Sequence, residues 1–342
     1  MTLRFSRTPT RASTLPLCPF AESLATPELG RADRIGKPEQ GACTPVDRFR
    51  ASCGPVRRLA RRFGRRITAR DFGAIMNILF ITSNRLGDTV LSTGLLGYLI
   101  ASHADARITI VCGPVPAPLF AATPNVVRVI ALAKRRWSLH WLGLWLATAG
   151  TVWDLVLDLR GSALGHCLLA RRRRRLPAGT ATTHQVIRLA QALDLATPPS
   201  PRLWPGDRHR AEARRLIPDG GLVLAVGPTA NWVGKQWPAD RFAAAVHQLT
   251  APDGMLAGAR VAVFGAMDER AAAAPLLAAI PAPRRIDLVG HGDLLTTYAC
   301  LERSSFYIGN DSGLMHMAAA SGIPTLGLFG PSREDVYGPW GA

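Results

Sequence analysis

From residue 77 onward, short apolar runs alternate with longer stretches in which apolar positions recur every three or four residues. The short runs are typical of buried strands, and the longer stretches are typical of helices that bury one face. Their repeated alternation predicts an α/β protein with parallel sheets. The expected strands are 78–81, 108–111, 126–130, 154–159, 222–226, 261–265, 306–308 and 325–329. The expected helices are 89–102, 137–148, one that ends in 171–175, 184–195, 208–216, 239–249, 294–302 and 312–321.

The segment Ala196-Thr-Pro-Pro-Ser-Pro201 interrupts this pattern and is typical of a linker. We therefore expect two facing Rossmann-like domains, at 76–200 and 201–342, with the site in the cleft between them. Residues 1–75 show no helical or strand periodicity, and we expect a basic, disordered extension there. Met76 directly precedes the first strand, so the functional part is expected to begin at that residue.

Two stretches of the first domain have unusual composition. Residues 137–148 are apolar nearly all round, which predicts a buried helix, although an interfacial membrane helix is the alternative. Residues 171–175 are five consecutive arginines, which usually form a solvated face. Beside an anionic membrane these arginines would also contribute about 1 kcal/mol each of attraction.

The bulk composition narrows the class of protein. The net charge of the 342 residues is +17, and residues 1–75 hold 15 Lys/Arg against 6 Asp/Glu. The six cysteines show no zinc-like spacing, which fits a reducing compartment and a metal-free protein. We find no signal peptide and no apolar run of the ~18 residues that a membrane span needs, so we expect a cytoplasmic location. Nucleic acid is not expected as a partner, although the arginine pairs between 57 and 66 could touch nucleic acid or anionic lipid.

The segment 306–332 has the pattern of a strand, a polar hinge, a helix and a second strand. The hinge places Asn310, Asp311 and Ser312 at a helix N-terminus, where free N–H groups and the helix dipole favour phosphate. Asp311 or Ser312 could instead only cap the helix. His316, in the same helix, could be a packed or surface histidine rather than a functional one.

Four polar loops follow expected strands, at 84–88, 228–235, 267–269 and 310–313. In parallel sheets such loops meet at the carboxyl edge, where ligands bind. The sequence lacks G-x-G-x-x-G after the first strand, a Walker motif and an Asp-x-Asp pair. Without a metal, a leaving diphosphate would be neutralised by Lys235 and the helix N-terminus at Ser312 and Gly313.

An enzyme that transfers a group to a hydroxyl needs one base to take the proton of that hydroxyl. Asp88 is the candidate because it follows the first strand, in the other domain from the phosphate binder. Gly87 before it would allow close approach of the backbone. The alternative role of Asp88 is as the N-cap of the helix that follows.

Several of these stretches resemble the signatures of glycosyltransferase family 9, which contains the ADP-heptose:lipopolysaccharide heptosyltransferases. The similar stretches are Asn84-Arg-Leu-Gly-Asp-Thr-Val-Leu-Ser-Thr93, Lys235-Gln-Trp-Pro238, Gly265-Ala-Met-Asp-Glu269 and the segment 306–332. The resemblance covers about residues 77–340 and implies the GT-B fold. It also implies an acceptor-binding domain at 76–200 and a nucleotide-sugar-binding domain at 201–342.

The resemblance assigns roles to individual residues. It implies that Asp88 is the base, that Lys235 contacts phosphate and sugar, and that Glu269 holds the ribose. The remaining donor contacts that it implies are Thr229, Leu294, Asp311, Ser312, Gly313 and His316. The arginines expected to bind the acceptor are Arg85 and Arg160.

Two features depart from the family pattern. Members usually continue past Tyr337-Gly-Pro-Trp-Gly with further helix, whereas this sequence stops at Ala342, so the resemblance implies a truncated second domain. Members also carry an additional basic residue after Asp158-Leu-Arg-Gly161, which is missing from Ser162-Ala-Leu-Gly165. Acceptor-phosphate recognition would then fall to Arg160 and the arginines 171–175.

These observations together predict an inverting, metal-independent transferase without a cofactor. The resemblance implies that the donor is ADP-heptose, or carries a related sugar, and that the acceptor is an anionic, lipid-linked lipopolysaccharide core, reached at the cytoplasmic face of the inner membrane through peripheral contact. A catalytically silent nucleotide-binding module and a basic peripheral membrane adaptor are the alternatives.

Overall fold

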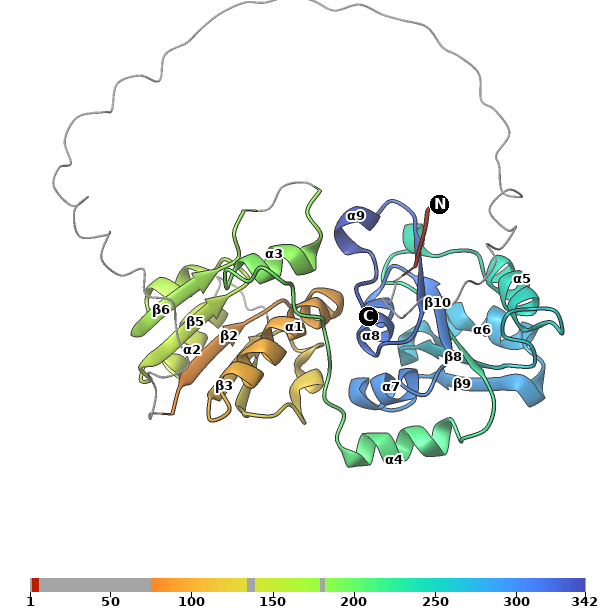
Figure 1. Ribbon diagram of the computed structural model, residues 1–342, viewed down its shortest axis with the longest axis horizontal. Coiled ribbons are helices and arrows are strands. Elements are labelled where there is room, and N and C mark those ends of the chain that lie inside the picture. The colour runs from red at the N-terminus through yellow and green to blue at the C-terminus, as the bar shows by residue number, and fades with distance from the viewer. Residues whose placement is uncertain (1, 6–74, 134–138, 179–181, 342) are drawn as a thin grey trace, which may run out of the picture. The chain divides into compact units, whose positions relative to one another are not determined.

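The computed structural model describes residues 2–5, 75–133, 139–178 and 182–341, which all belong to one compact unit. Within these residues the strands form two sheets, one from residues 75–200 and one mainly from residues 201–341, here called the N-terminal and C-terminal halves. Figure 1 shows helices packed beside each sheet. The expected α/β class and parallel sheets are confirmed, with one exception described below.

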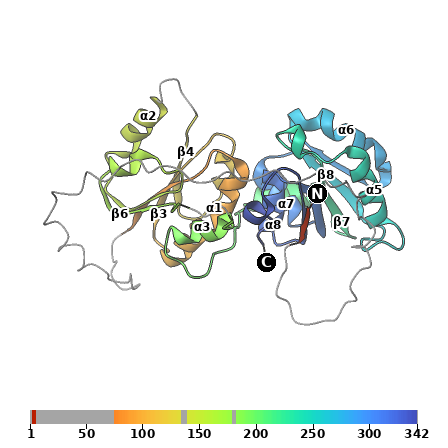
Figure 2. The ribbon, with the colours of Figure 1, turned by 90° about the horizontal axis from the view of Figure 1, so that it is seen from above.

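The sheet of the N-terminal half has, among the described residues, five parallel strands in the order β4-β3-β2-β5-β6. Buried apolar side chains on alternate faces of the central strands pack against α1 and α3 on one side and α2 on the other. Figure 2 shows α2 on the opposite side of this sheet from α1 and α3. The elements are β2 (Asn77–Ile81), α1 (Leu86–Ser102), β3 (Arg107–Cys112), η2 (Ala117–Phe120), β4 (Val126–Ala131), α2 (Leu139–Thr148), β5 (Trp153–Asp158), η4 (Ala163–His166), β6 (Ala170–Arg175) and α3 (Gln185–Gln191).

The described part of the C-terminal half repeats the plan with five parallel strands in the order β9-β8-β7-β10-β11. Beyond β11, β1 (Thr2–Phe5) adds a sixth strand that runs antiparallel. The other elements are α4 (Asp207–Leu216), β7 (Val223–Gly227), η5 (Val233–Lys235), α5 (Ala239–Thr250), β8 (Arg260–Gly265), η6 (Met267–Glu269), α6 (Arg270–Ala279), η7 (Ala282–Arg284), β9 (Arg285–Val289), α7 (Leu294–Leu301), β10 (Phe306–Asn310), α8 (Gly313–Ala320), β11 (Thr325–Phe329) and α9 (Glu334–Tyr337).

Both parallel sheets reverse their strand order at the same place. In each half the first strand lies between the second and the fourth, so the connections leave in opposite directions on either side of it. A crevice forms at the carboxyl ends of the strands at such a switch point, and ligands bind there. In this chain the switch points lie between β2 and β5 and between β7 and β10, which identifies the loops that can form a site.

The two halves share a core. One cluster of buried side chains includes Ile78 and Leu91 from the N-terminal half and Tyr307 and Met315 from the C-terminal half. The N–H of Arg202 also donates to Thr93 Oγ1 at 3.0 Å, which anchors the chain between the halves to α1. The contacts between the loops of the two switch points are therefore part of a packed structure.

Three expectations about the elements are wrong. Residues Thr2–Phe5 form β1, although no strand was expected in residues 1–75; the remaining residues to 74 lie outside the described ones. The helix expected to end in 171–175 is the edge strand β6, whose arginines are exposed. The helix α2 is not buried all round, because Leu142 and Leu146 face outward; Trp137 lies outside the described residues. The arginines can adopt a strand because an edge strand leaves room for charged side chains.

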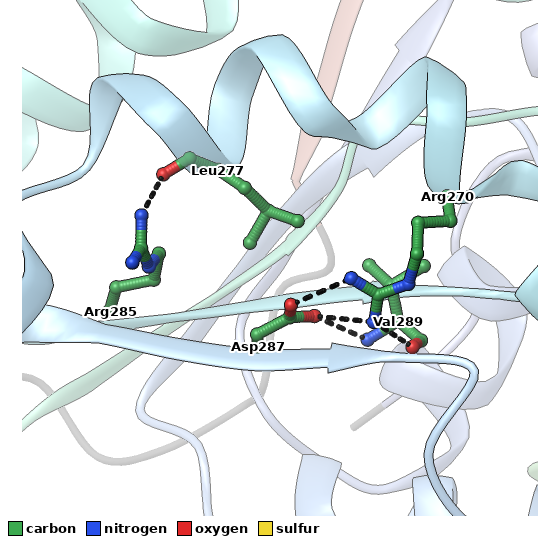
Figure 3. Close-up of polar contacts among 5 residues, drawn as sticks. All are labelled: Arg270, Leu277, Arg285, Asp287 and Val289. Carbon is green, nitrogen blue, oxygen red and sulfur yellow. Dashed lines mark hydrogen bonds and ion pairs between the residues drawn. The ribbon is translucent and has the colours of Figure 1, made fainter.

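The outermost strand of the second sheet, β9, was not expected from the sequence and is held by polar contacts to α6. Arg270 makes a bidentate pair with Asp287, with Nη1–Oδ2 at 3.0 Å and Nη2–Oδ1 at 3.3 Å, and its Nη2 also donates to Val289 O at 2.6 Å. Arg285 Nη1 donates to Leu277 O at 2.9 Å (Figure 3). The side chains of Arg285–Asp287 are exposed or only partly buried, so burial stabilises this part of β9 little. The polar contacts to α6 hold the strand in place instead.

None of the helices in the described part of the chain combines the length and the apolar character needed to cross a bilayer.

Candidate functional site

The loops at the switch point of the N-terminal half enclose a polar cavity of about 270 Å³. Residues after β2 and after β5 line it together, as the topology requires. A residue of the C-terminal segment, Tyr337, lines it as well. The lining residues are Thr82, Ser83, Asp88, Ser92, Leu159, Arg160, Gln185, Leu189 and Tyr337.

Asp88 lies in the first turn of α1 and lines this cavity. Its Oδ2 accepts a hydrogen bond of 3.3 Å from the Ser83 hydroxyl, and no cap bond is made by the N-cap residue, Arg85. Burial raises the pKa of Asp88, and Asp311 across the site adds to the rise, while Arg85, the Ser83 hydroxyl and Lys235 oppose it. A carboxylate with a raised pKa at a cavity wall is suited to take a proton.

The loop after β5 is held by Asp158, which is buried at the strand end. Its Oδ1 accepts from the Arg160 N–H at 2.9 Å and its Oδ2 from the Ser162 hydroxyl at 2.7 Å. The Arg160 guanidinium then lies 5.1 Å from the ring centre of Trp141, and its buried Nη1 has no hydrogen-bond partner among the described residues. A buried donor left free at a cavity wall is available to an anionic ligand.

In the C-terminal half, the loops after β7 and β10 are joined by two polar contacts. Lys235 Nζ lies 2.6 Å from Asp311 Oδ2, and both side chains are largely buried. Asn310 is fully buried; its Nδ2 donates to Pro228 O at 2.7 Å, and its Oδ1 accepts from the Trp237 N–H at 3.0 Å. The hinge predicted from the sequence therefore ties the two loops together and fixes the lysine beside the start of α8.

The N-termini of α1 and α8 meet without space for side chains. A Cβ atom on Gly87 would lie 2.7 Å from His316 Cδ2, and one on Gly313 would lie 2.7 Å from Leu86 Cγ. The first turn of α8 holds no acidic residue, and the N-cap, Ser312, makes no side-chain cap bond. The positive end of α8 thus points into the region that Asp88 faces from α1.

His316 is buried in this contact, and its Nδ1 has no hydrogen-bond partner among the described residues. Burial lowers the pKa of His316 to about 4, although Asp311 opposes the shift. The imidazole is therefore neutral at pH 7 and packs against the backbone of Gly87.

Three other residues that were expected to bind the donor do not take part in the contact between α1 and α8. Thr229 is buried after β7, with its Oγ1 within 3.6 Å of the Cβ position of Gly265. Glu269 Oε2 accepts from the Ala266 N–H at 2.8 Å, so the carboxylate caps its own turn. Leu294 opens α7 and packs against the core. Their roles, and that of the exposed Arg85 in the acceptor site, stay predictions.

Besides Asp88 and Arg160, seven residues line the cavity that were not predicted as site residues, among them the polar Ser83, Gln185 and Tyr337. Ser83 could have been found from its position at the end of a strand beside the signature. Gln185 at the start of α3 and Tyr337 in α9 had no such signal, because only the tertiary structure brings them to Asp88. Within the part of the chain that the structure describes, no three His, Cys, Asp or Glu side chains gather in a way that could hold a metal ion. Metal independence stays a prediction.

Comparisons with known proteins agree with this geometry. Residues 157–342 match the model of glycosyltransferase family 9 (heptosyltransferase). Lipopolysaccharide heptosyltransferase 1 of Pseudomonas aeruginosa is 29% identical over 314 residues, which cover 78% of this chain and 82% of that protein. Lipopolysaccharide heptosyltransferase 2 of Salmonella typhimurium is 29% identical over 151 residues, so this chain spans only 42% of its length.

A solved structure shares the fold. The ADP-heptose lipopolysaccharide heptosyltransferase II of Escherichia coli superposes with a TM-score of 0.63 at 21% identity, covering 78% of this chain and 88% of that one. The likeness extends over both halves and supports the GT-B arrangement of two Rossmann-like sheets.

Proposed function

Because the chain belongs to glycosyltransferase family 9, we propose that it is an inverting, metal-independent transferase that moves a heptose from ADP-heptose to a lipopolysaccharide-core saccharide. The relatives named above are heptosyltransferases, and the solved neighbour is named for ADP-heptose. The observation that carries the proposal is the position of Asp88. Its pKa is raised, and it faces the charged pair Lys235–Asp311 across the contact between α1 and α8.

In the proposed reaction, Asp88 takes the proton of the acceptor hydroxyl while the hydroxyl oxygen attacks the anomeric carbon of the donor. The bond from that carbon to the diphosphate oxygen breaks as the new glycosidic bond forms, and its electrons leave with ADP. A single displacement of this kind inverts the anomeric configuration. The cavity beside Asp88 is bounded by Arg160, which suits an acceptor that carries phosphate.

The negative charge that develops on the leaving diphosphate needs compensation. We assign this role to Lys235 and to the N–H groups of Ser312 and Gly313 at the positive end of α8. Asp311 Oδ2 lies 2.6 Å from Lys235 Nζ, so the ammonium group would contact both this carboxylate and the phosphates. Asp311 would also orient the sugar. Thr229 would contact phosphate, Glu269 the ribose and Leu294 the base. His316 would keep α8 at its distance from α1.

The acceptor in this proposal is lipid-linked, so the reaction would take place at the cytoplasmic face of the inner membrane, with the protein bound peripherally.

A donor screen tests the function. The full chain is incubated with a lipid A-core acceptor and ADP-, UDP- or GDP-linked sugars, and products are identified by mass spectrometry. We expect a mass increase of one heptose with ADP-heptose only. Transfer from a UDP- or GDP-sugar would overturn the donor assignment. Tight binding of ADP with no transfer from any donor would overturn the enzymatic proposal in favour of a silent nucleotide-binding module.

A further inference from the structure

The outward face of α2 is apolar. Leu144 and Thr148 point into the core, whereas Leu142 and Leu146 are 54% and 66% exposed and Trp145 is 38% exposed. A helix that borders water normally carries charged or polar residues on its outer face. The described residues of α2 include no charged side chain at all. Apart from the partly exposed His140, its outer surface therefore lacks the polar side chains that water would favour.

The apolar surface continues past the helix. Val152 and Leu169, at the starts of β5 and β6, are 54% and 65% exposed, and the Trp153 N–H donates to Leu169 O at 2.9 Å, which holds these two ends together. Between α2 and the loop at 162–167 lies a hollow of about 400 Å³ walled mainly by apolar atoms. Its lining residues are Trp141, Trp145, Ser162, Leu164 and Cys167. We call Leu142, Trp145, Leu146, Val152 and Leu169 the α2 patch.

Three arginines of β6 lie on the same face of the sheet as α2. The register pairs Val156 with Arg173, and Val156 belongs to the cluster buried under α2. Because side chains alternate along a strand, Arg171 and Arg175 share that face, whereas Arg172 and Arg174 point to the other one. All five arginines are exposed.

A common loop joins Arg173 and Arg175 to α2, whereas Arg171 is held by Asp154 of β5, with Nη1–Oδ1 at 3.1 Å. Trp145 Nε1 donates to Cys167 O at 3.0 Å. Arg173 donates from Nε to Gly165 O at 2.7 Å and from Nη2 to Leu168 O at 2.6 Å. Arg175 Nη1 contacts His166 Nε2 at 2.9 Å. The α2 patch and the three arginines are therefore parts of one fixed surface.

From this combination we propose that the α2 patch and Arg171, Arg173 and Arg175 dock the protein on an anionic lipid bilayer. The leucines and Trp145 enter the boundary between headgroups and acyl chains, where an indole with an apolar body is favoured. The arginines contact lipid phosphates, and their stems extend over the apolar surface. The inference deepens the proposed function, because a lipid-linked acceptor would be presented at such a surface.

The positive charge beside the α2 patch argues against residues 1–75 or a second copy of the chain as the binding partner. Charged side chains on an edge strand prevent pairing between sheets, but this role explains only β6 and leaves the apolar face of α2 unexplained. Residues 1–75 carry 15 Lys/Arg against 6 Asp/Glu, the same sign as β6, so they do not complement it. A second copy would bring its own arginines toward these. An anionic bilayer offers both an apolar layer and negative charge.

Cosedimentation of the full chain with vesicles tests the proposal. Vesicles of phosphatidylcholine with phosphatidylglycerol are compared with phosphatidylcholine alone, without donor or acceptor. Each arginine that contacts an anionic surface is worth about fivefold in the partition constant, so replacing all three with Gln should weaken binding about a hundredfold. Leu142→Glu with Leu146→Glu should weaken binding to both kinds of vesicle. Thermal melting checks that each variant is folded.

The same strand provides the matched control. The variant Arg172→Gln with Arg174→Gln removes similar charge from the opposite face and should change vesicle binding far less. Because both arginine variants keep residues 1–75, any attraction of that segment to the vesicles is the same in both. Equal losses in the two sets of arginine variants would overturn the proposal, as would unchanged binding of the leucine variant. A dimer in sedimentation velocity that the leucine variant abolishes, without vesicle binding by the parent chain, would assign the surface to a second copy.

A delipidated core acceptor separates this inference from the proposed function. Transfer to that acceptor should be the same in the parent chain and in the leucine variant. Vesicle binding without any transfer would reject only the proposed function, and transfer without vesicle binding would reject only the docking surface.

Discussion

The N-termini of α1 and α8 lie against each other and yet are built in opposite ways. α1 carries Asp88 in its first turn, so the positive end of that helix has a negative charge of its own. α8 has no acid in its first turn and no side-chain cap, and Lys235 is held nearby by Asp311. This difference indicates that the α1 side of the contact can accept a proton and that the α8 side can bind an anion. Each prediction below changes one side of this contact and states which measured property should respond.

The largest effect is expected from Asp88→Asn. An amide cannot take the acceptor proton, so kcat should fall by about 10²- to 10⁴-fold, the usual contribution of a general base. The Kd of ADP should stay within a few-fold, since the anion binds on the α8 side. Steady-state kinetics and calorimetry measure the two quantities, and the exposed Asp105→Asn is the control. A variant that loses ADP affinity in proportion to kcat would show that the two sides are not separate.

Gly87→Ala is expected to have the next largest effect, because its Cβ would lie 2.7 Å from the buried His316 ring. The start of α1 must then move away from α8 and take Asp88 with it. A displacement of about 1 Å can cost 10²-fold in rate, so we expect a fall of about that size in kcat. Gly143→Ala in α2 is the matched control, since nothing lies within 4 Å of its Cβ position. Full activity in Gly87→Ala would mean that the close contact of the helices is not needed for transfer.

Lys235→Met should weaken anion binding on the α8 side of the contact. A hydrogen bond to a charged group is worth about 1.5–3 kcal/mol, so the Kd of ADP should rise about 10- to 100-fold. The variant also leaves Asp311 buried without its cation and should lower the melting temperature.

A second substitution separates these two effects of Lys235→Met. Adding Asp311→Asn should restore much of the melting temperature but not the ADP affinity. Arg241→Met, on the exposed side of α5, serves as the control. Recovery of both properties in the double variant would make the pair structural only.

The sequence predicted the parts of the contact that depend on local pattern. β11 (Thr325–Phe329) has the predicted bounds, and α8 and α1 begin within three residues of theirs, because strand, hinge and helix signals follow each other closely there. The loops that line the site were also predicted, since parallel topology brings the carboxyl ends of the strands together. Local pattern could not show that Gly87 lies against His316 or that Tyr337 lines the cavity beside Asp88, because these contacts join residues more than 200 positions apart.

Predictions from the sequence were wrong where the same local composition is compatible with two different structures. Five arginines are compatible with a helix end or with an exposed edge strand, and only the pairing of β6 with β5 decides between them. An apolar helix is compatible with a fully buried place or with one exposed face, and α2 has the exposed face. In both cases the tertiary neighbours, not the residues themselves, select the structure.

The smallest expected effect is a shift of the pH profile, which is measured separately from any change in the maximal rate. Burial raises the pKa of Asp88, and Arg85 is the strongest of the groups that oppose this rise. Arg85→Gln should therefore raise that pKa further. The base works only when ionised, so the fall of kcat/KM on the acid side should move to higher pH. Asp311→Asn removes a charge that raises the pKa, so the fall should move to lower pH in that variant. Profiles of kcat/KM against pH for the parent and both variants measure these shifts. If both variants moved the acid limb in the same direction, the group that titrates there would not be Asp88.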